Sequence, residues 1–336
     1  MRLRPLSPAL WIAALYLTAA CAPAPAPPAD SPTCAPATAA ALAASVTRAI
    51  HGIPTLTAAP TAAPTDPAQP TAAASPTPAL APTATVLGWL AQHDPYLLRV
   101  PAAAPGDEVI GLSAGNHALV ARRYGAGERA LLLVGGMHGG WEQNTVVLVE
   151  RLASHFAAHP EDIPAGWSVV LVPAANPDGV LLGRSTAGRF NSHGVDLNRN
   201  WGCDWQPAAV WRETPVSPGA GPLSEPETQA LAAFITRLQP AAALFYHSQA
   251  GGVFEGDCPT SPATVDSAQM AAVYGEASGY AYGRSFSAYP VTGTAASWAD
   301  GQGIYSADVE LATPNLAEFD ANLRGVLALL AWLDGR

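Results

Sequence analysis

Short apolar runs bounded by glycine, proline or polar residues recur along the last two-thirds of the chain. Runs of this length and setting predict buried strands. They lie at Ala118–Arg123, Leu131–Val134, Trp167–Val172, Ala241–Tyr246 and Ile304–Leu311.

Segments with apolar residues at helical spacing fall between and after these runs. They are Asn144–His159, Glu225–Leu238, Ser267–Ser278 and Asn315–Leu333. We expect Ser224 to cap the second of these helices and Asp266 to cap the third. Because strands alternate with helices, the sequence predicts an α/β domain with a mixed central sheet flanked by helices.

The first 85 residues have a different composition. Residues 1–21 have a basic start, an apolar run and small residues before Cys21, which is the layout of a secretory signal peptide. Leu17–Cys21 also resembles a bacterial lipobox, although Thr18 stands where an aliphatic residue is usual, so simple cleavage and lipidation of Cys21 both stay open. Residues 22–85, rich in Pro, Ala and Thr, predict a disordered linker. We expect the folded domain at residues 86–336 and a secreted or cell-surface protein.

Charge excludes several classes of function. The chain has 336 residues, a formal net charge of −10 and 16 basic residues, all of them Arg. Without Lys, P-loop phosphate binding and Schiff-base chemistry are not available. An acidic chain with no basic block is also not expected to bind nucleic acid. We expect a monomer whose one membrane contact would be a lipid on Cys21.

Three cysteines remain besides Cys21. Cys203 and Cys258 fall in loops rich in Gly, Asp or Pro within one domain, whereas Cys34 lies in the linker. Because export permits disulfides, we expect Cys203 to pair with Cys258. Three free thiols are the alternative.

Polar side chains stand at the ends of two predicted strands. His138 and Glu142 follow Leu131–Val134, and His247 ends Ala241–Tyr246. In open α/β sheets ligands gather at the carboxyl ends of strands, and two His with one Glu suit a catalytic zinc site. The alternative to a metal site is that all three residues are structural. His138 would then be a turn residue, Glu142 would begin a helix, and His247 would end a strand.

Glu310 and a polar stretch at residues 188–201 add further candidate chemistry. Glu310 is an acid within an apolar strand, where burial is costly unless the carboxylate is used, for example as a base beside a zinc-bound water. The polar stretch contains Arg189, Asn198 and Arg199. A guanidinium beside amides is suited to grip a carboxylate, and a polar surface loop is the alternative.

In their order along the chain, these motifs resemble the zinc carboxypeptidases of the carboxypeptidase A type. The motifs are His138 with Glu142, Asn176-Pro177-Asp178-Gly179, Gly194-Val195-Asp196-Leu197-Asn198-Arg199-Asn200, His247-Ser248 and Glu310. The resemblance runs from about Ile110 to the C-terminus. It implies a zinc carboxypeptidase-like catalytic domain at residues 86–336 with one zinc ion per chain.

The resemblance implies roles around the metal. His138, Glu142 and His247 would bind zinc, and Glu310 would be the general base and acid. Asp196 would accept a hydrogen bond from His138 and orient its imidazole.

The resemblance also implies roles in binding the substrate. Arg189 would stabilise the oxyanion, and Asn198 and Arg199 would hold the terminal carboxylate. Tyr289 would close over the substrate, and Ala296 would lie near the position that sets side-chain specificity.

One motif departs from the family pattern. The family has His-x-x-Glu, whereas His138-Gly139-Gly140-Trp141-Glu142 is one residue longer. A bulge at the flexible glycines would absorb the extra residue. Without such a bulge, the second metal ligand would be lost.

The implied activity is a zinc-dependent exopeptidase that removes C-terminal residues from peptides. Because Ala296 is small and uncharged, a pocket for Lys or Arg is not expected. An amidase or carboxypeptidase acting on murein stem peptides is the alternative within the same fold. A catalytically inactive surface binding module is the alternative of another class, and damage among the ligands or the base would indicate it.

A second motif points to different chemistry. Gly111-Leu112-Ser113-Ala114-Gly115 matches the nucleophile elbow of serine hydrolases. That motif needs a strand before it and a helix directly after it. Because Asn116–Arg123 has the pattern of a strand, we assign Ser113 no catalytic role.

Overall fold

The computed structural model describes residues 106–336, apart from 262, 263 and 285. Several expectations concern residues outside this part: the signal peptide, the linker, Cys21, Cys34 and the domain start at residue 86. None of the helices in the described part combines the length and apolar character needed to cross a membrane.

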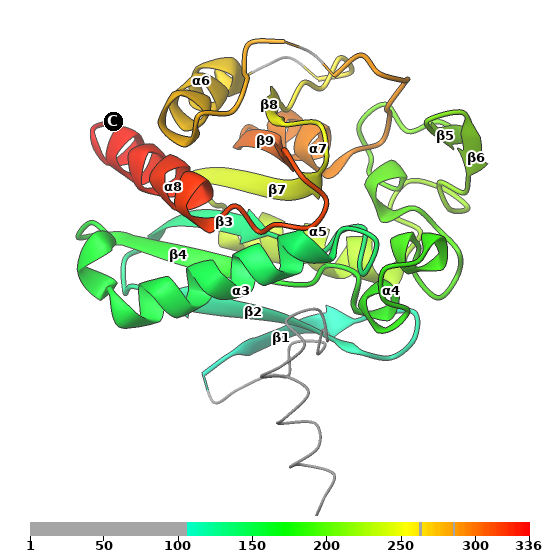
Figure 1. Cartoon of the computed structure of the whole chain (residues 1–336), viewed down its shortest axis with the longest axis horizontal. Coiled ribbons are helices and arrows are strands. Elements are labelled where there is room, and N and C mark those ends of the chain that lie inside the picture. Colours follow the sequence, from blue (N-terminus) through cyan, green and yellow to red (C-terminus); the bar gives the residue numbers. More distant parts are fainter. Residues whose placement is uncertain (1–105, 262–263, 285) are drawn as a thin grey trace, which may run out of the picture. The chain divides into compact units, whose positions relative to one another are not determined.

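A seven-stranded mixed sheet forms the centre of the described part, in the order β1-β2-β4-β3-β7-β9-β8 (Figure 1). The inner strands run parallel and are β4 (Trp167–Val172), β3 (Arg129–Val134), β7 (Ala242–Ser248) and β9 (Tyr305–Leu311). The antiparallel strands are β1 (Glu108–Leu112) and β2 (Ala118–Tyr124) at one edge and β8 (Gly252–Glu255) at the other. The expected α/β fold with a mixed sheet is confirmed.

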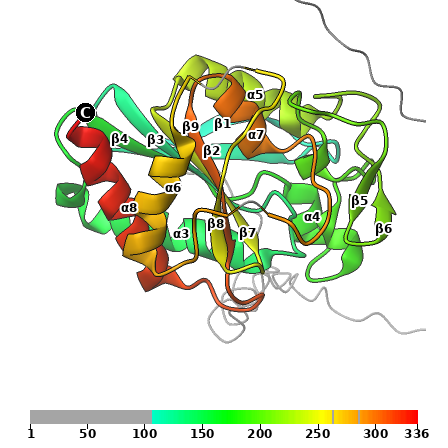
Figure 2. The same ribbon diagram turned by 90° about the horizontal axis from the view of Figure 1, so that it is seen from above.

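Helices cover both faces of the sheet, and Figure 2 shows the two layers. One face carries α3 (Gln143–Ala158), α6 (Ser267–Ser278) and α8 (Phe319–Asp334). The other carries α5 (Pro226–Leu238) and α7 (Ala295–Gly301). The short α4 (Pro177–Leu181) follows β4, and both views place the hairpin of β5 (Ala209–Trp211) and β6 (Thr214–Val216) at the same end of the sheet.

The core lies on both sides of the inner strands. Leu133, Leu244 and Val309 are fully buried against α3, α6 and α8, whereas Leu132 and Phe245 are buried toward α5 and α7. Successive side chains of a strand point to opposite faces, so a strand covered on both faces needs apolar residues at every position. This explains why the inner strands appear in the sequence as unbroken apolar runs.

Two helix starts differ from the expectation. The N-cap of α5 is Glu225 rather than Ser224, because the Ser224 hydroxyl instead accepts from the Asn200 amide and donates to Glu225. The last helix begins at Phe319 rather than Asn315. Glu318, at φ +50°, precedes it with a carboxylate that accepts from the backbone N–H groups of Ala312 and Thr313. The expected N-cap of α6, Asp266, is confirmed.

A disulfide joins Cys203, in the loop before β5, to Cys258, in the loop after β8. This is the expected pair. It ties the segment that leads into the β5–β6 hairpin to the far edge of the sheet.

Candidate active site

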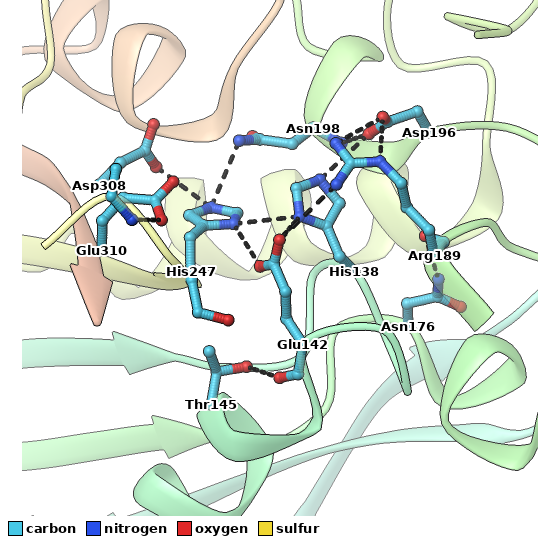
Figure 3. Close-up of polar contacts among 12 residues, drawn as sticks. His138, Glu142, Thr145, Asn176, Arg189, Asp196, Asn198, His247, Asp308 and Glu310 are labelled. Carbon is cyan, nitrogen blue, oxygen red and sulfur yellow. Dashed lines mark hydrogen bonds and ion pairs between the residues drawn. The ribbon is translucent and has the colours of Figure 1, made fainter. Parts of the chain in front are cut away.

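The carboxyl ends of three parallel strands bring the candidate residues together (Figure 3). His247 lies on β7 directly opposite Glu310 on β9, and His138 follows the end of β3 on the other side of β7. Because parallel strands end at the same edge of a sheet, residues more than a hundred positions apart in the chain meet there.

His138, Glu142 and His247, here called the metal centre, offer ligand atoms that all lie within 4.8 Å of one another. The Nδ1 atom of His138 lies 2.8 Å from Oε1 of Glu142 and 3.3 Å from Nδ1 of His247. The Nδ1 atom of His247 lies 3.1 Å from Oε2 of Glu142. All three residues are buried.

The longer spacing between His138 and Glu142 is absorbed in a tight turn. Gly139 has φ +42°, and a Cβ there would lie 2.6 Å from the backbone of Gly179. Only glycine tolerates both conditions. The Glu142 N–H still donates to the His138 carbonyl, and Thr145 donates its hydroxyl to the Glu142 carbonyl at 2.7 Å. The added residue therefore does not separate the two side chains.

The donor set of the metal centre fits a metal cation. Each imidazole has a carboxylate near its outer nitrogen: Nε2 of His138 lies 3.2 Å from Asp196, and Nε2 of His247 lies 3.3 Å from Asp308. With their protons on Nε2, both rings direct Nδ1 lone pairs toward each other and toward an anionic Glu142. These lone pairs and the carboxylate repel one another unless a cation lies between them. Two His and one Glu are also a known ligand set of catalytic zinc.

Electrostatics in the metal-free chain agree with this conclusion. Burial opposes ionisation of Glu142, yet the two histidines hold the pKa of its carboxyl well below the usual value. Burial would likewise lower the pKa of His247, but Asp308 and Glu142 raise it well above the usual value. The site thus attracts positive charge, which a proton supplies when no metal is bound.

Arg189 and Asp196 form a buried ion pair beside the metal centre. Nε and one terminal nitrogen of Arg189 lie 2.9 and 2.8 Å from the same oxygen of Asp196. The other terminal nitrogen lies 3.6 Å from Glu142. Although burial opposes it, Arg189 and then His138 hold the pKa of Asp196 well below its usual value. Asp196 therefore stays anionic, and one end of the Arg189 guanidinium faces the metal centre.

The pKa of Glu310 shifts in the opposite direction from the pKa values of Glu142 and Asp196. Burial raises the pKa of its carboxyl to about 7, and the negative charge of Glu142 adds to the effect. One of its oxygens accepts from the Ala250 N–H at 3.1 Å. A carboxyl with a pKa near neutrality is suited to both accepting and returning a proton.

Asn198 and Arg199 lie side by side in a short turn that Asp196 caps through the Asn198 N–H. The Asn198 carbonyl oxygen accepts from the Ala295 N–H at 3.0 Å, and its amide nitrogen lies 3.3 Å from Nε2 of His247. Arg199 donates to the backbone carbonyls of Val210 and Asn198. These bonds fix the plane of its guanidinium at the wall of the cavity described next.

A cavity of about 480 Å³ opens over the metal centre. Its lining includes two aromatic groups: Trp141 packs edge to face on Trp211, and Phe286 packs edge to face on both Phe254 and Tyr289. The cavity is also lined by the metal-centre residues, Glu310, Asn198 and four arginines, Arg184, Arg189, Arg199 and Arg212. An aromatic and cationic cavity with convergent polar groups is typical of a ligand site.

Ala296 is the one candidate substrate residue that the structure does not bring to this cavity. It lies in α7 with 1% of its surface exposed, and its carbonyl accepts from the Ser306 hydroxyl. The helix turns this position toward the sheet, which its spacing from Trp298 in the sequence does not reveal.

The serine motif at Ser113 belongs to a separate polar group, here called the Asp178 cluster (Ser113, His117 and Asp178). Ser113 lies in the turn of the β1–β2 hairpin, so no helix follows it. Its hydroxyl donates to Asp178 at 2.5 Å, and Nδ1 of His117 lies 2.9 Å from the same oxygen. Ser113 thus bonds to the carboxylate rather than to the imidazole that would activate it.

Asp308 is the functional candidate that sequence reasoning missed. It stands two residues before Glu310, and alternation along a strand puts both on the same face. The sequence could have revealed Asp308 through this spacing. A second carboxylate on the same face of an apolar strand needs a partner of its own, as Glu310 does.

Comparison with known proteins agrees with this geometry. The zinc carboxypeptidase family model matches residues 106–320. Murein peptide amidase A of Escherichia coli K12 is 36% identical over an alignment of 129 positions, and the alignment covers 34% of this chain and 48% of that protein. The aligned part therefore spans about half the length of this relative.

Solved structures share the fold. A murein-tripeptide amidase from Escherichia coli O157 superposes with a TM-score of 0.52 at 25% identity, covering 70% of this chain and 94% of that one. Carboxypeptidase A from Helicoverpa armigera gives a TM-score of 0.54 at 18% identity, over 73% of this chain and 71% of that one. The second likeness concerns the fold alone.

The family match covers well over half of the chain, and the ligand set of the family is present at one edge of the sheet. The chain belongs to the zinc carboxypeptidase family of metal-dependent hydrolases.

Proposed function

We propose that the protein is a zinc-dependent exopeptidase that hydrolyses the bond next to a terminal carboxylate of its substrate. The observation that carries this proposal is the convergence of His138, Glu142 and His247 with Glu310 and Arg199 around one cavity. These three ligands would hold a zinc ion, which would supply Lewis acidity and lower the pKa of a bound water molecule.

The side chains around the metal centre divide the remaining work. Glu310 takes a proton from the attacking water and returns it to the leaving amine, a role suited to a carboxylate that lines the cavity opposite His247 in the sheet. Asp196 binds one end of the Arg189 guanidinium. The other end faces the developing oxyanion and stabilises its charge. Because Asp196 fixes the guanidinium, this donor needs no rearrangement when charge develops.

Arg199 binds the substrate carboxylate, with Asn198 beside it. Its bonds to backbone carbonyls leave further N–H donors, and a guanidinium matches a carboxylate in geometry. Tyr289, held by Phe286 at the cavity wall, contacts the bound substrate.

A pair of substrates tests the carboxylate requirement. Peptides of the same sequence, one with a free C-terminus and one with a C-terminal amide, are incubated with the zinc-loaded protein and followed by mass spectrometry. We expect cleavage of the free acid alone, abolished by a chelator and restored by zinc. Equal cleavage of both peptides, or cleavage that survives zinc removal, would contradict the proposal.

Murein stem peptides are the second candidate substrate. Murein peptide amidase A of Escherichia coli, which the chain matches in sequence and in a solved structure, is named as a murein amidase. In addition, Arg184 and Arg212 are exposed arginines that line the cavity beside Arg189 and Arg199. Stem peptides carry free carboxylates besides the terminal one, and extra guanidinium groups suit such a substrate.

Arg212→Gln separates the two candidates. If stem peptides are the substrate, the variant should lose rate on a murein tripeptide more than on a neutral peptide of equal length. A wild-type enzyme that prefers the neutral peptide would argue for a general carboxypeptidase instead. Arg237→Gln, an exposed arginine outside the cavity, is the matched control.

Export is part of the same proposal. The layout of residues 1–21 and the Cys203–Cys258 disulfide both support an oxidising compartment. Fractionation of cells, together with labelling of wild-type and Cys21→Ser protein by a fatty-acid analogue, distinguishes a secreted from a lipid-anchored form. Recovery of the full-length chain in the cytoplasm would contradict export.

A further inference from the structure

His247 has two polar neighbours of opposite character at its outer nitrogen (Figure 3). Asp308 on β9 places a carboxylate oxygen 3.3 Å from Nε2, and the amide nitrogen of Asn198 also lies 3.3 Å from it. The carboxylate can only accept a hydrogen bond, whereas an amide nitrogen can only donate one. Nε2 cannot satisfy both neighbours at once.

The orientation of the Asn198 amide is fixed from behind. Its oxygen accepts from the Ala295 N–H at 3.0 Å, so its nitrogen faces His247. Asn198 is buried and cannot turn this donor to solvent. Without Asp308, the amide would therefore favour the form of His247 that has its lone pair on Nε2.

That form is the wrong one for the metal centre. A neutral imidazole carries one proton, so a lone pair on Nε2 places the proton on Nδ1. Nδ1 is the atom that lies among Glu142 and His138, at 3.1 and 3.3 Å. A protonated Nδ1 has no lone pair for a metal ion.

We propose that Asp308 is a positioning residue that selects the tautomer of His247, a role that rests on the proposed zinc site. The Asp308 oxygen that faces Nε2 is buried and has no hydrogen-bond partner among the described residues, so the Nε2 proton is the donor that it lacks. A charge-assisted bond to a carboxylate is about twice as strong as one between neutral groups, so this carboxylate favours a proton on Nε2 over the lone pair that Asn198 favours. The proton then stays on Nε2 and the Nδ1 lone pair faces the metal. Asp196 stands in the same relation to Nε2 of His138, at 3.2 Å.

Zinc affinity tests the inference without any substrate, so it stands apart from a failure of the peptidase proposal. We expect Asp308→Ala to weaken zinc binding by about 10–100-fold in competition with a chelator, the range found for groups that orient metal-bound histidines. Glu255→Gln is the matched control, since it removes a half-buried carboxylate from the neighbouring β8 and should leave zinc affinity unchanged.

A double variant tests the competition directly. If Asn198 drives the wrong tautomer once Asp308 is gone, then Asp308→Ala with Asn198→Ala should bind zinc more tightly than Asp308→Ala alone. Nitrogen-15 NMR of the zinc-loaded wild type should find the His247 proton on Nε2.

Two outcomes would overturn the inference: wild-type zinc affinity in Asp308→Ala, or a His247 proton absent from Nε2 in the zinc-loaded wild type. If Asp308→Ala does not fold, Asp308→Asn keeps the volume and an acceptor oxygen. It should give a smaller but measurable loss, and wild-type zinc affinity in this variant would also count against Asp308.

Discussion

The metal centre and the Asp178 cluster use nearly the same parts. Each sets an imidazole Nδ1 within 2.9 Å of a carboxylate oxygen, and each holds a buried acid. They differ in what surrounds the acid. Donors from Ser113, His117 and the backbone at Gly115 and Ser192 all converge on the Asp178 carboxylate.

Around the metal centre the balance is reversed. Each imidazole also has a carboxylate at its Nε2, and with the protons held there both Nδ1 atoms and the Glu142 carboxylate are acceptors that face one another at the wall of a cavity. The comparison teaches that a surplus of acceptors beside open space indicates a cation site, whereas a carboxylate surrounded by donors stabilises the fold.

Replacing one histidine from each group gives the largest expected contrast. His247→Ala removes a proposed metal ligand, so zinc should no longer be retained on dialysis and turnover should be lost. His117→Ala, with a side chain 42% exposed, should keep one zinc ion per chain. Equal zinc content in the two variants would contradict the assignment of the metal site to the metal centre.

Glu310→Gln separates zinc binding from catalysis. We expect the variant to keep zinc but to lose about 10²–10⁴-fold in kcat/KM, because the amide cannot accept the proton of the attacking water. Metal analysis and steady-state kinetics on the same sample measure both effects. Wild-type turnover in this variant would remove Glu310 from its role.

Asp178→Ala should reduce stability and leave the metal centre intact. The substitution leaves the buried Ser113 hydroxyl and three part-buried donors without their acceptor, at a cost of about 1–3 kcal/mol in the free energy of unfolding. Denaturant unfolding and zinc analysis measure the two properties. Loss of zinc from a folded variant would show that the two groups are not independent.

The smallest effect is a difference in pH dependence. In the metal-free chain the pKa of Glu310 is raised from 4.5 to about 7, so its contribution to stability is complete below about pH 4.5 and is lost as pH rises through 7. Asp178, whose pKa is lowered to about 2 against burial by bonds from Ser113 and His117, contributes above about pH 4 and loses that contribution as pH falls.

Unfolding of metal-free Glu310→Gln measures this effect. Between pH 5 and 8 the wild type should lose roughly 2 kcal/mol of unfolding free energy relative to the variant. Parallel curves for the two proteins would contradict the raised pKa.

The sequence predicted the metal centre because His138 and Glu142 follow one strongly apolar strand and His247 lies near the end of another. His138, Glu142 and His247 could therefore be placed at one edge of a parallel sheet before any contact was known. The pairing of Cys203 with Cys258 followed from similar loop positions. In each case local pattern and global fold agree.

Other features depend on tertiary context. The strands β5, β6 and β8 are too short to show a period, and the side of α7 that carries Ala296 depends on how the helix docks. In the sequence, Asp308 is one more acidic residue in an apolar strand, with nothing to mark it as the acceptor that His247 needs. Its meaning required the position of Asn198, which comes from a distant loop.

The strand order has a consequence for how the protein is made. β9 lies between β7 and β8 in the sheet although it follows both in the chain, so Glu310 is synthesised after all three metal ligands. A chain broken off before residue 305 would carry every ligand side chain but no Glu310. The proposed hydrolysis therefore depends on the synthesis of β9 as well as of the three ligands.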